Sequence, residues 1–150
     1  ISHTASMLAQ KGIVLVCSAG NSGRDPWKKV TPPGDARDVL TVGAIDAKGL
    51  NTAFSSIGPS QDGRVKPDIM ARGGQARIFN AAGVNGTANG TSFASPIACG
   101  MVACLWQALP GKTAKEIISI VQQSADRYQT PDNIFGYGIP NFWKAYQNAR

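Results

Sequence analysis

A long apolar run from Ser92 to Leu109 constrains the fold of this chain more than any other segment. A helix over this run would be apolar on nearly every side, which predicts a helix buried among other elements. Pro110-Gly111 ends the run. Pro96 falls close to its beginning, where a missing N–H costs little, so it marks the start of the helix. At 150 residues the chain is large enough for one globular unit with a sizeable core.

The other apolar segments predict an alternation of helices and strands. Ser2–Gln10 suits a short helix that ends at Gly12, and Ile13–Cys17 follows it directly as a buried strand. A helix that leads into a buried strand indicates an α/β fold with a mostly parallel, covered sheet. Further strands are predicted at 39–44, 65–71 and 76–79, and further helices at 113–123, with a Thr113/Glu116 capping box, and at 141–148.

Charge and hydropathy argue against two classes of partner. The net charge is +6, but the basic residues are scattered and only Lys28 and Lys29 are adjacent, so we expect no nucleic-acid partner. Gly100 and Gln107 interrupt the longest apolar run, so we expect no membrane span. The first residues lack the pattern of a signal peptide, so we expect any targeting information to lie elsewhere.

Three cysteines, Cys17, Cys99 and Cys104, cannot all pair within one chain, and none stands at a spacing typical of a metal site. Each lies inside an apolar segment. The sequence therefore predicts buried free thiols.

A serine and an asparagine stand at positions suited to acyl-transfer chemistry. Ser92 lies at the start of the predicted apolar helix, and Gly90 lets the backbone turn sharply before it. The N-terminus of a helix offers unpaired N–H groups and a partial positive charge, which favour an oxyanion beside the serine. Asn21 follows a predicted strand at its carboxyl end, where α/β sheets bind ligands. Taken alone, Ser92 could equally be a helix N-cap, and Asn21 a turn residue.

Several separate segments, in order along the chain, resemble the subtilisin-like serine proteases, the subtilase or peptidase S8 family. The resemblance runs from about Gly12 to the end of the chain. The segment with Asn21 is similar to the strand that carries the family's oxyanion asparagine, and the segment with Ser92 is similar to its nucleophile motif. The matching segments are Ser18-Ala19-Gly20-Asn21, Val42-Gly43-Ala44, Phe54 to Pro59, Lys66-Pro67-Asp68-Ile69, Gly90 to Pro96 and Gly136-Tyr137-Gly138.

The resemblance implies roles for the two candidate catalytic residues. Ser92 would attack the scissile carbonyl. Asn21 would stabilise the tetrahedral oxyanion together with the Ser92 amide.

The resemblance also implies a substrate pocket. Ser18, Ala19 and Gly20 would line the S1 pocket and pair with the substrate backbone. Thr31 would lie at the base of that pocket, and the Thr31–Pro32 bond is expected to be cis, as the matching bond is in many relatives.

The family's catalytic aspartate and histidine precede the serine, so both are expected upstream of Ile1. His3, the single histidine, lies on a predicted helix without the glycine-rich surroundings of the family's base, which predicts a surface residue. The aspartates before Ser92 lie in predicted loops or, for Asp68, in the lysine-proline segment. We therefore expect a truncated or cleaved chain that is inactive alone and tends to self-associate through exposed core.

Three other readings remain as alternatives. The parent could be a catalytically dead pseudo-protease that acts as a binding module, and only the upstream sequence discriminates this. An esterase or acyltransferase would need a Gly-x-Ser-x-Gly elbow and a later histidine, whereas Phe93-Ala94 follows Ser92 and no histidine does. A nucleotide-binding domain would need a glycine motif after a strand, which the sequence lacks.

The resemblance thus implies the C-terminal portion of a single peptidase domain over residues 1–150. The expected architecture is a subtilisin-like three-layer α/β fold with a mostly parallel sheet, incomplete here. The resemblance implies no required cofactor, although the parent can carry structural calcium. Expected partners are peptide or protein substrates and the N-terminal part of its own catalytic domain, and the parent is expected to be secreted or in the cell envelope.

Overall fold

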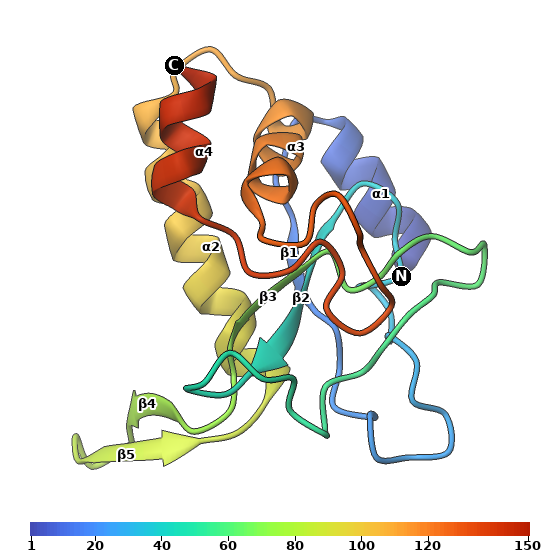
Figure 1. The fold of residues 1–150 in the computed structure, drawn as a ribbon, viewed down its shortest axis with the longest axis vertical. Helices are drawn as coiled ribbons and strands as arrows, with labels where there is room; N and C mark the ends of the chain where they lie inside the picture. The colour runs from blue at the N-terminus through green and yellow to red at the C-terminus, as the bar shows by residue number, and fades with distance from the viewer.

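The computed structural model describes residues 1–150 and has an α/β architecture, as predicted (Figure 1). A three-stranded parallel sheet lies between helices, and a separate two-stranded ribbon extends from it. In chain order the elements are α1 (Ser2–Gln10), β1 (Val16–Ser18), β2 (Leu40–Ile45), β3 (Ile69–Arg72), β4 (Ala76–Phe79), β5 (Asn85–Ala88), α2 (Thr91–Ala108), α3 (Ala114–Ser124) and α4 (Phe142–Ala149).

The strands of the main sheet are parallel and ordered β1-β2-β3. Val16 pairs with Leu40, and Val42 pairs with Ile69. β2 is buried along its whole length because it lies between the other two strands. The outer edge of β3 is covered, since the Met70 N–H donates to Gly138, whereas the outer edge of β1 has no strand beside it.

Helices cover both faces of this sheet, which gives three layers. Leu40, Val42 and Ala44 point to one face, where they form the main core with α2, α3 and α4. Val39, whose side chain points the opposite way, packs with Ala5 of α1 in a second, smaller core. α1 and α2 therefore lie on opposite faces of the sheet, as Figure 1 also shows.

Local signals set the boundaries of the last two helices. The capping box predicted at the start of α3 is present: the Thr113 hydroxyl accepts from the Glu116 N–H, and the Glu116 carboxylate accepts from the Thr113 N–H. Asn141 caps α4 by accepting from the Lys144 N–H at 2.9 Å. None of the four helices combines the length and the apolar character that crossing a membrane requires.

A buried ion pair joins the sheet to α3. Lys66 and Asp68 lie 2.6 Å apart, and their side chains are almost entirely inaccessible to solvent. The Lys66 ammonium also donates to the Thr41 hydroxyl at 2.9 Å. The Asp68 carboxylate accepts from the Thr41 N–H and from the Gln122 amide on α3. Every charge in this pair is thus hydrogen-bonded, as burial requires.

Several predictions about the strands are wrong in detail. β1 begins at Val16 rather than Ile13 and is only half-buried, because it lies at an edge of the sheet. The Ala76–Phe79 strand does not join the parallel sheet; it pairs antiparallel with β5, which the sequence analysis missed. β5 has the sequence Asn-Gly-Thr-Ala and lacks the apolar pattern by which strands are recognised.

The predicted burial of the apolar helix is half right. Ala94, Ala98 and Val102 are buried against the sheet, but Ile97 and Met101 on another face are exposed. Pro96 is the sixth residue of α2, further inside the helix than predicted.

The predictions for the cysteines and for the cis bond also need correction. All three cysteines are free, but only Cys17 is partly buried; Cys99 and Cys104 are exposed because nothing covers their faces of α2. The Thr31–Pro32 bond is not cis; the cis bond lies one residue later, at Pro32–Pro33.

Candidate active site

Ser92 is the second residue of α2 and lies at the carboxyl end of the parallel sheet. The start of α2 is held there by hydrogen bonds to Gly20 and Asn21, which follow β1 directly. Ser92 is exposed, and none of the chain's hydrogen bonds uses its hydroxyl or its N–H. Both groups are therefore free to act on a molecule outside the chain.

The side chain of Asn21 is oriented by Thr91. Its Oδ1 accepts from the Thr91 N–H at 2.9 Å and from the Thr91 hydroxyl at 3.0 Å. The same hydroxyl accepts from the Gly20 N–H at 3.2 Å. Because the oxygen end of the amide is occupied in this way, the Nδ2 end is left without a partner and lies close to Gly90.

The arrangement leaves two N–H donors at the start of one helix. One is the Ser92 backbone N–H, and the other is the Asn21 Nδ2 group, which the Thr91 contacts hold on the same loop edge. The helix N-terminus adds a partial positive charge. Donors fixed in advance beside an exposed hydroxyl are suited to an oxyanion that forms when that hydroxyl attacks a carbonyl.

The residues predicted to line the pocket are brought together. The Ala19 N–H donates to Val42, and the Ala19 carbonyl accepts from the Thr31 N–H at 3.1 Å. Gly20 has a φ of +101°, and a Cβ at this position would lie 2.6 Å from Thr31 Oγ1. Gly20 is thus required both by its backbone conformation and by the nearby Thr31 side chain. Ser18 ends β1 directly before this segment.

Two residues that the sequence analysis did not single out complete the site. Thr91 holds Asn21 and Gly20, as described above. Ser56 is buried and supports the same loop, because its hydroxyl accepts from the Ser22 N–H and its own N–H donates to Gly20. Both residues lie within segments that carry the family resemblance. Their contacts join residues 34 to 71 positions apart, however, and no short-range sequence pattern predicts such contacts.

No side chain of this chain serves Ser92 as a base. His3 is exposed on α1, which lies on the opposite face of the sheet from α2. This agrees with the surface position predicted for it. Asp68 is engaged with Lys66 in the core. Asp62 is an exposed loop residue, and hydrogen bonds from Arg64 and Ser60 hold its pKa well below the ordinary value. The Leu50 N–H likewise lowers the pKa of Asp46.

The side chains do not form a metal site. No group of three or more histidine, cysteine, aspartate or glutamate residues converges anywhere in the structure.

Comparison with known protein families gives a match over most of the chain. The model of the Subtilase family, Peptidase_S8, matches residues 2–138. Serine protease AprX of Bacillus subtilis is 35% identical over 154 residues, covering 87% of this chain and 34% of the relative. The human membrane-bound transcription factor site-1 protease is 31% identical, covering 93% of this chain and 14% of the relative. The chain thus spans only a minor part of the length of these relatives.

Solved structures agree with the sequence match. The self-cleaved protease domain of PatA superposes with a TM-score of 0.81 at 27% identity, covering 99% of this chain and 54% of that domain. The prenylagaramide maturation protease PagA gives a TM-score of 0.82 at 25% identity, with 99% and 55% covered. The chain reproduces about half of each of these protease structures.

Proposed function

The chain belongs to the subtilase family, and from that premise we propose that it is the C-terminal part of a serine endopeptidase domain with Ser92 as nucleophile. The observation that carries the proposal is the free Ser92 hydroxyl beside two unpaired N–H donors, its own and that of Asn21. An exposed serine without such donors would be an ordinary helix residue.

In the proposed reaction, Ser92 Oγ bonds to the scissile carbonyl carbon while its proton passes to a histidine supplied from outside this chain. The carbonyl oxygen becomes an oxyanion and accepts hydrogen bonds from the Ser92 N–H and from Asn21 Nδ2. Collapse of this intermediate transfers the proton to the leaving amine and breaks the peptide bond. Water then hydrolyses the acyl-enzyme. All of these groups are protein groups, so we propose no required cofactor.

The pocket residues would hold the substrate. Ser18, Ala19 and Gly20 would line the S1 pocket and lie against the substrate backbone, and Thr31 lies beside Gly20, where the base of that pocket would be. The proposed substrates are therefore peptides or proteins. Export to the cell envelope or beyond is a proposal that rests on the family alone.

The remainder of the domain would add at β1. The chain covers about half of the related protease structures, and the outer edge of β1 lacks a strand while that of β3 is covered. We propose that the N-terminal part of the same domain pairs there and brings the missing aspartate and histidine. The Ser95 hydroxyl of α2 donates to the Val16 carbonyl of β1, so this flank of α2 lies against β1.

The second candidate function is a pseudo-protease that binds peptides without cleaving them. This chain holds no base for Ser92, because His3, its single histidine, lies on the opposite face of the sheet, so the choice between the two functions depends on the upstream part. Under this alternative the upstream part would lack a usable base, while the pocket at Gly20 would be retained.

Hydrolysis of a chromogenic peptide anilide tests the proposal. The chain alone should give only background turnover, and the chain joined to its natural upstream sequence should give turnover that Ser92→Ala abolishes. Ser95→Ala, a second serine at the start of α2, is the matched control and should retain most activity. Brisk turnover by the chain alone would refute the need for an upstream base. Absence of turnover in the complete protein, with peptide binding retained, would favour the pseudo-protease.

A further inference from the structure

The backbone of Asn21 makes no hydrogen bond of its own within this chain, although the Asn21 amide is one of the two proposed oxyanion donors. Asn21 is exposed, and the Thr91 contacts hold only its side-chain oxygen. The place of the Asn21 backbone therefore depends on its two neighbours in the chain, Gly20 and Ser22.

Ser56 binds both of these neighbours. The Ser56 N–H donates to the Gly20 carbonyl at 2.9 Å, and the Ser56 hydroxyl accepts from the Ser22 N–H at 3.0 Å. Ser56 is completely buried, and a hydrogen bond is electrostatically stronger in the protein interior than in water. One residue thus fixes the chain on either side of Asn21.

Glycines let the loop approach the segment 54–56 closely. A Cβ at Gly20 would lie 3.0 Å from the Ser56 hydroxyl oxygen. A Cβ at Gly23 would lie 2.4 Å from the Ser55 carbonyl oxygen, closer than any real side chain could stand. The chain before and after the oxyanion donor therefore packs directly against this segment, with no side chain between them.

The segment 54–56 is itself fixed to the sheet, next to Ser56. The Ser55 hydroxyl accepts from the Ala44 N–H of β2 at 3.0 Å. Thr52 donates to the Ala44 carbonyl from its N–H at 3.0 Å and from its hydroxyl at 2.9 Å. Two adjacent buried serines thus have different partners, since Ser55 binds the sheet and Ser56 binds the loop that carries Asn21.

We propose that Ser56 is a positioning residue for the oxyanion donor Asn21, an inference that rests on the proposed function of Asn21. Thr91 determines which end of the amide faces outward, whereas Ser56 determines where the amide stands relative to Ser92. An oxyanion donor is effective only when it is fixed before the reaction begins. All of these contacts join residues of this chain, so the remainder of the domain supplies none of them.

Hydrolysis of a peptide anilide by the chain joined to its natural upstream sequence tests this inference. Ser56→Ala should lower kcat about five- to tenfold with little change in KM, because a loosened donor weakens a contact made in the transition state. Ser55→Ala is the matched control, since it removes an equally buried hydroxyl that accepts one backbone N–H at the same distance, but from β2. It should leave kcat unchanged and cost a similar amount of stability in guanidinium unfolding.

A double variant tests whether Ser56 acts through Asn21. In an Asn21→Ala background, Ser56→Ala should have no further effect on kcat, because the donor that it positions is gone. Equal kcat values for Ser56→Ala and Ser55→Ala would overturn the inference. A loss of kcat that persists in the Asn21→Ala background would overturn it as well.

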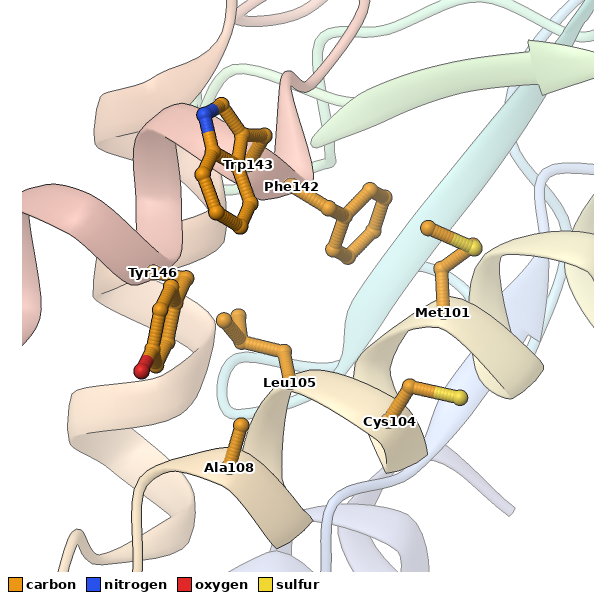
Figure 2. Close-up of a pocket in the computed structure, with 7 residues that line it drawn as sticks. All are labelled: Met101, Cys104, Leu105, Ala108, Phe142, Trp143 and Tyr146. Carbon is orange, nitrogen blue, oxygen red and sulfur yellow. The ribbon is translucent and has the colours of Figure 1, made fainter.

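Leu105→Ala separates general instability from misplacement of the donor. Leu105 is buried on α2 and lines an apolar hollow of about 360 Å³ between α2 and α4, which Trp143 of α4 also lines (Figure 2). It lies about 20 Å along the helix from Ser92. Its truncation should lower the stability and leave kcat unchanged. A loss of kcat as large as that of Ser56→Ala would overturn the inference, since instability alone would then explain both.

Failure of the proposed function would be recognised separately. Turnover that Ser92→Ala leaves intact, or no turnover by the complete protein, would count against the proposed function. In either case the ¹H–¹⁵N NOE of the Asn21 side-chain amide decides this inference, because it reports the mobility of the amide without any reaction. Ser56→Ala should lower this NOE and Ser55→Ala should not. An NOE that Ser56→Ala leaves unchanged would overturn the inference.

Discussion

Thr91 holds the side-chain amide of Asn21 through two hydrogen bonds to the same oxygen, although the two residues are 70 positions apart in the chain. An amide can be turned with either its oxygen or its nitrogen outward. Because the Thr91 hydroxyl and N–H both donate, only the oxygen fits against them. The nitrogen must then face outward, where it can serve as an oxyanion donor.

The first prediction concerns the Thr91 hydroxyl in the complete protease domain. Thr91→Val should lower kcat about tenfold with little change in KM, because one of the two contacts that orient Asn21 is lost. Thr91→Ser keeps the hydroxyl and should restore most of the rate. Asn21→Ala should cost more, roughly 10² to 10³ in kcat, which is the magnitude already measured for the oxyanion asparagine of a subtilisin. Equal rates for the Thr91→Val variant and the parent would show that Asn21 needs no such support.

The second prediction concerns the buried Lys66–Asp68 pair. Lys66→Met should destabilise the fold by roughly 3 to 5 kcal/mol in guanidinium unfolding, since it leaves the Asp68 charge buried without its counter-ion. Arg37→Met breaks the exposed pair with Asp62 and should have little effect. The double variant Lys66→Met/Asp68→Leu should recover part of the loss. A Lys66→Met variant as stable as the parent would contradict this account.

The third prediction concerns the capping box of α3. Thr113→Ala should cost about 1 kcal/mol in thermal or chemical unfolding, because the cap of α3 is lost. The Thr113 N–H and hydroxyl hold the pKa of Glu116 below its ordinary value of 4.5. A lowered pKa means that the stabilisation is present above this ordinary value and is lost as the pH falls through the folded one. Thr113→Ala keeps the N–H, which is the larger cause, and removes the hydroxyl, so it should flatten part of the loss of stability in acid; an unchanged acid profile would argue against a role for the hydroxyl.

The fourth prediction concerns the free thiols. Iodoacetamide should modify Cys99 and Cys104 before Cys17, because the first two are exposed on α2 whereas burial raises the pKa of the Cys17 thiol. Peptide mapping by mass spectrometry after timed alkylation follows each site, and denatured chain should show no such order. Fast modification of Cys17 in the folded chain would mean that β1 opens readily at its free edge.

Short-range patterns of the sequence determined much of the fold. The boundaries of α1, β2, α3 and α4 were predicted within one or two residues, because caps, glycines and apolar spacing act over one or two turns. Ser92 and Asn21 were singled out by their places at the start of a helix and the end of a strand. The family resemblance then supplied their expected roles, which stay predictions until activity is measured.

Tertiary structure alone decided the remaining features. The partner of β4, the exposure of Met101 on an apolar helix and the contact between Thr91 and Asn21 depend on which distant segments meet. Apolar content reports that a side chain can be buried, but not which element will cover it. Hydrogen bonds across 70 residues likewise leave no local pattern, since the intervening chain can take many paths. For these reasons the hollow that Trp143 lines between α2 and α4 could be identified only in the folded chain.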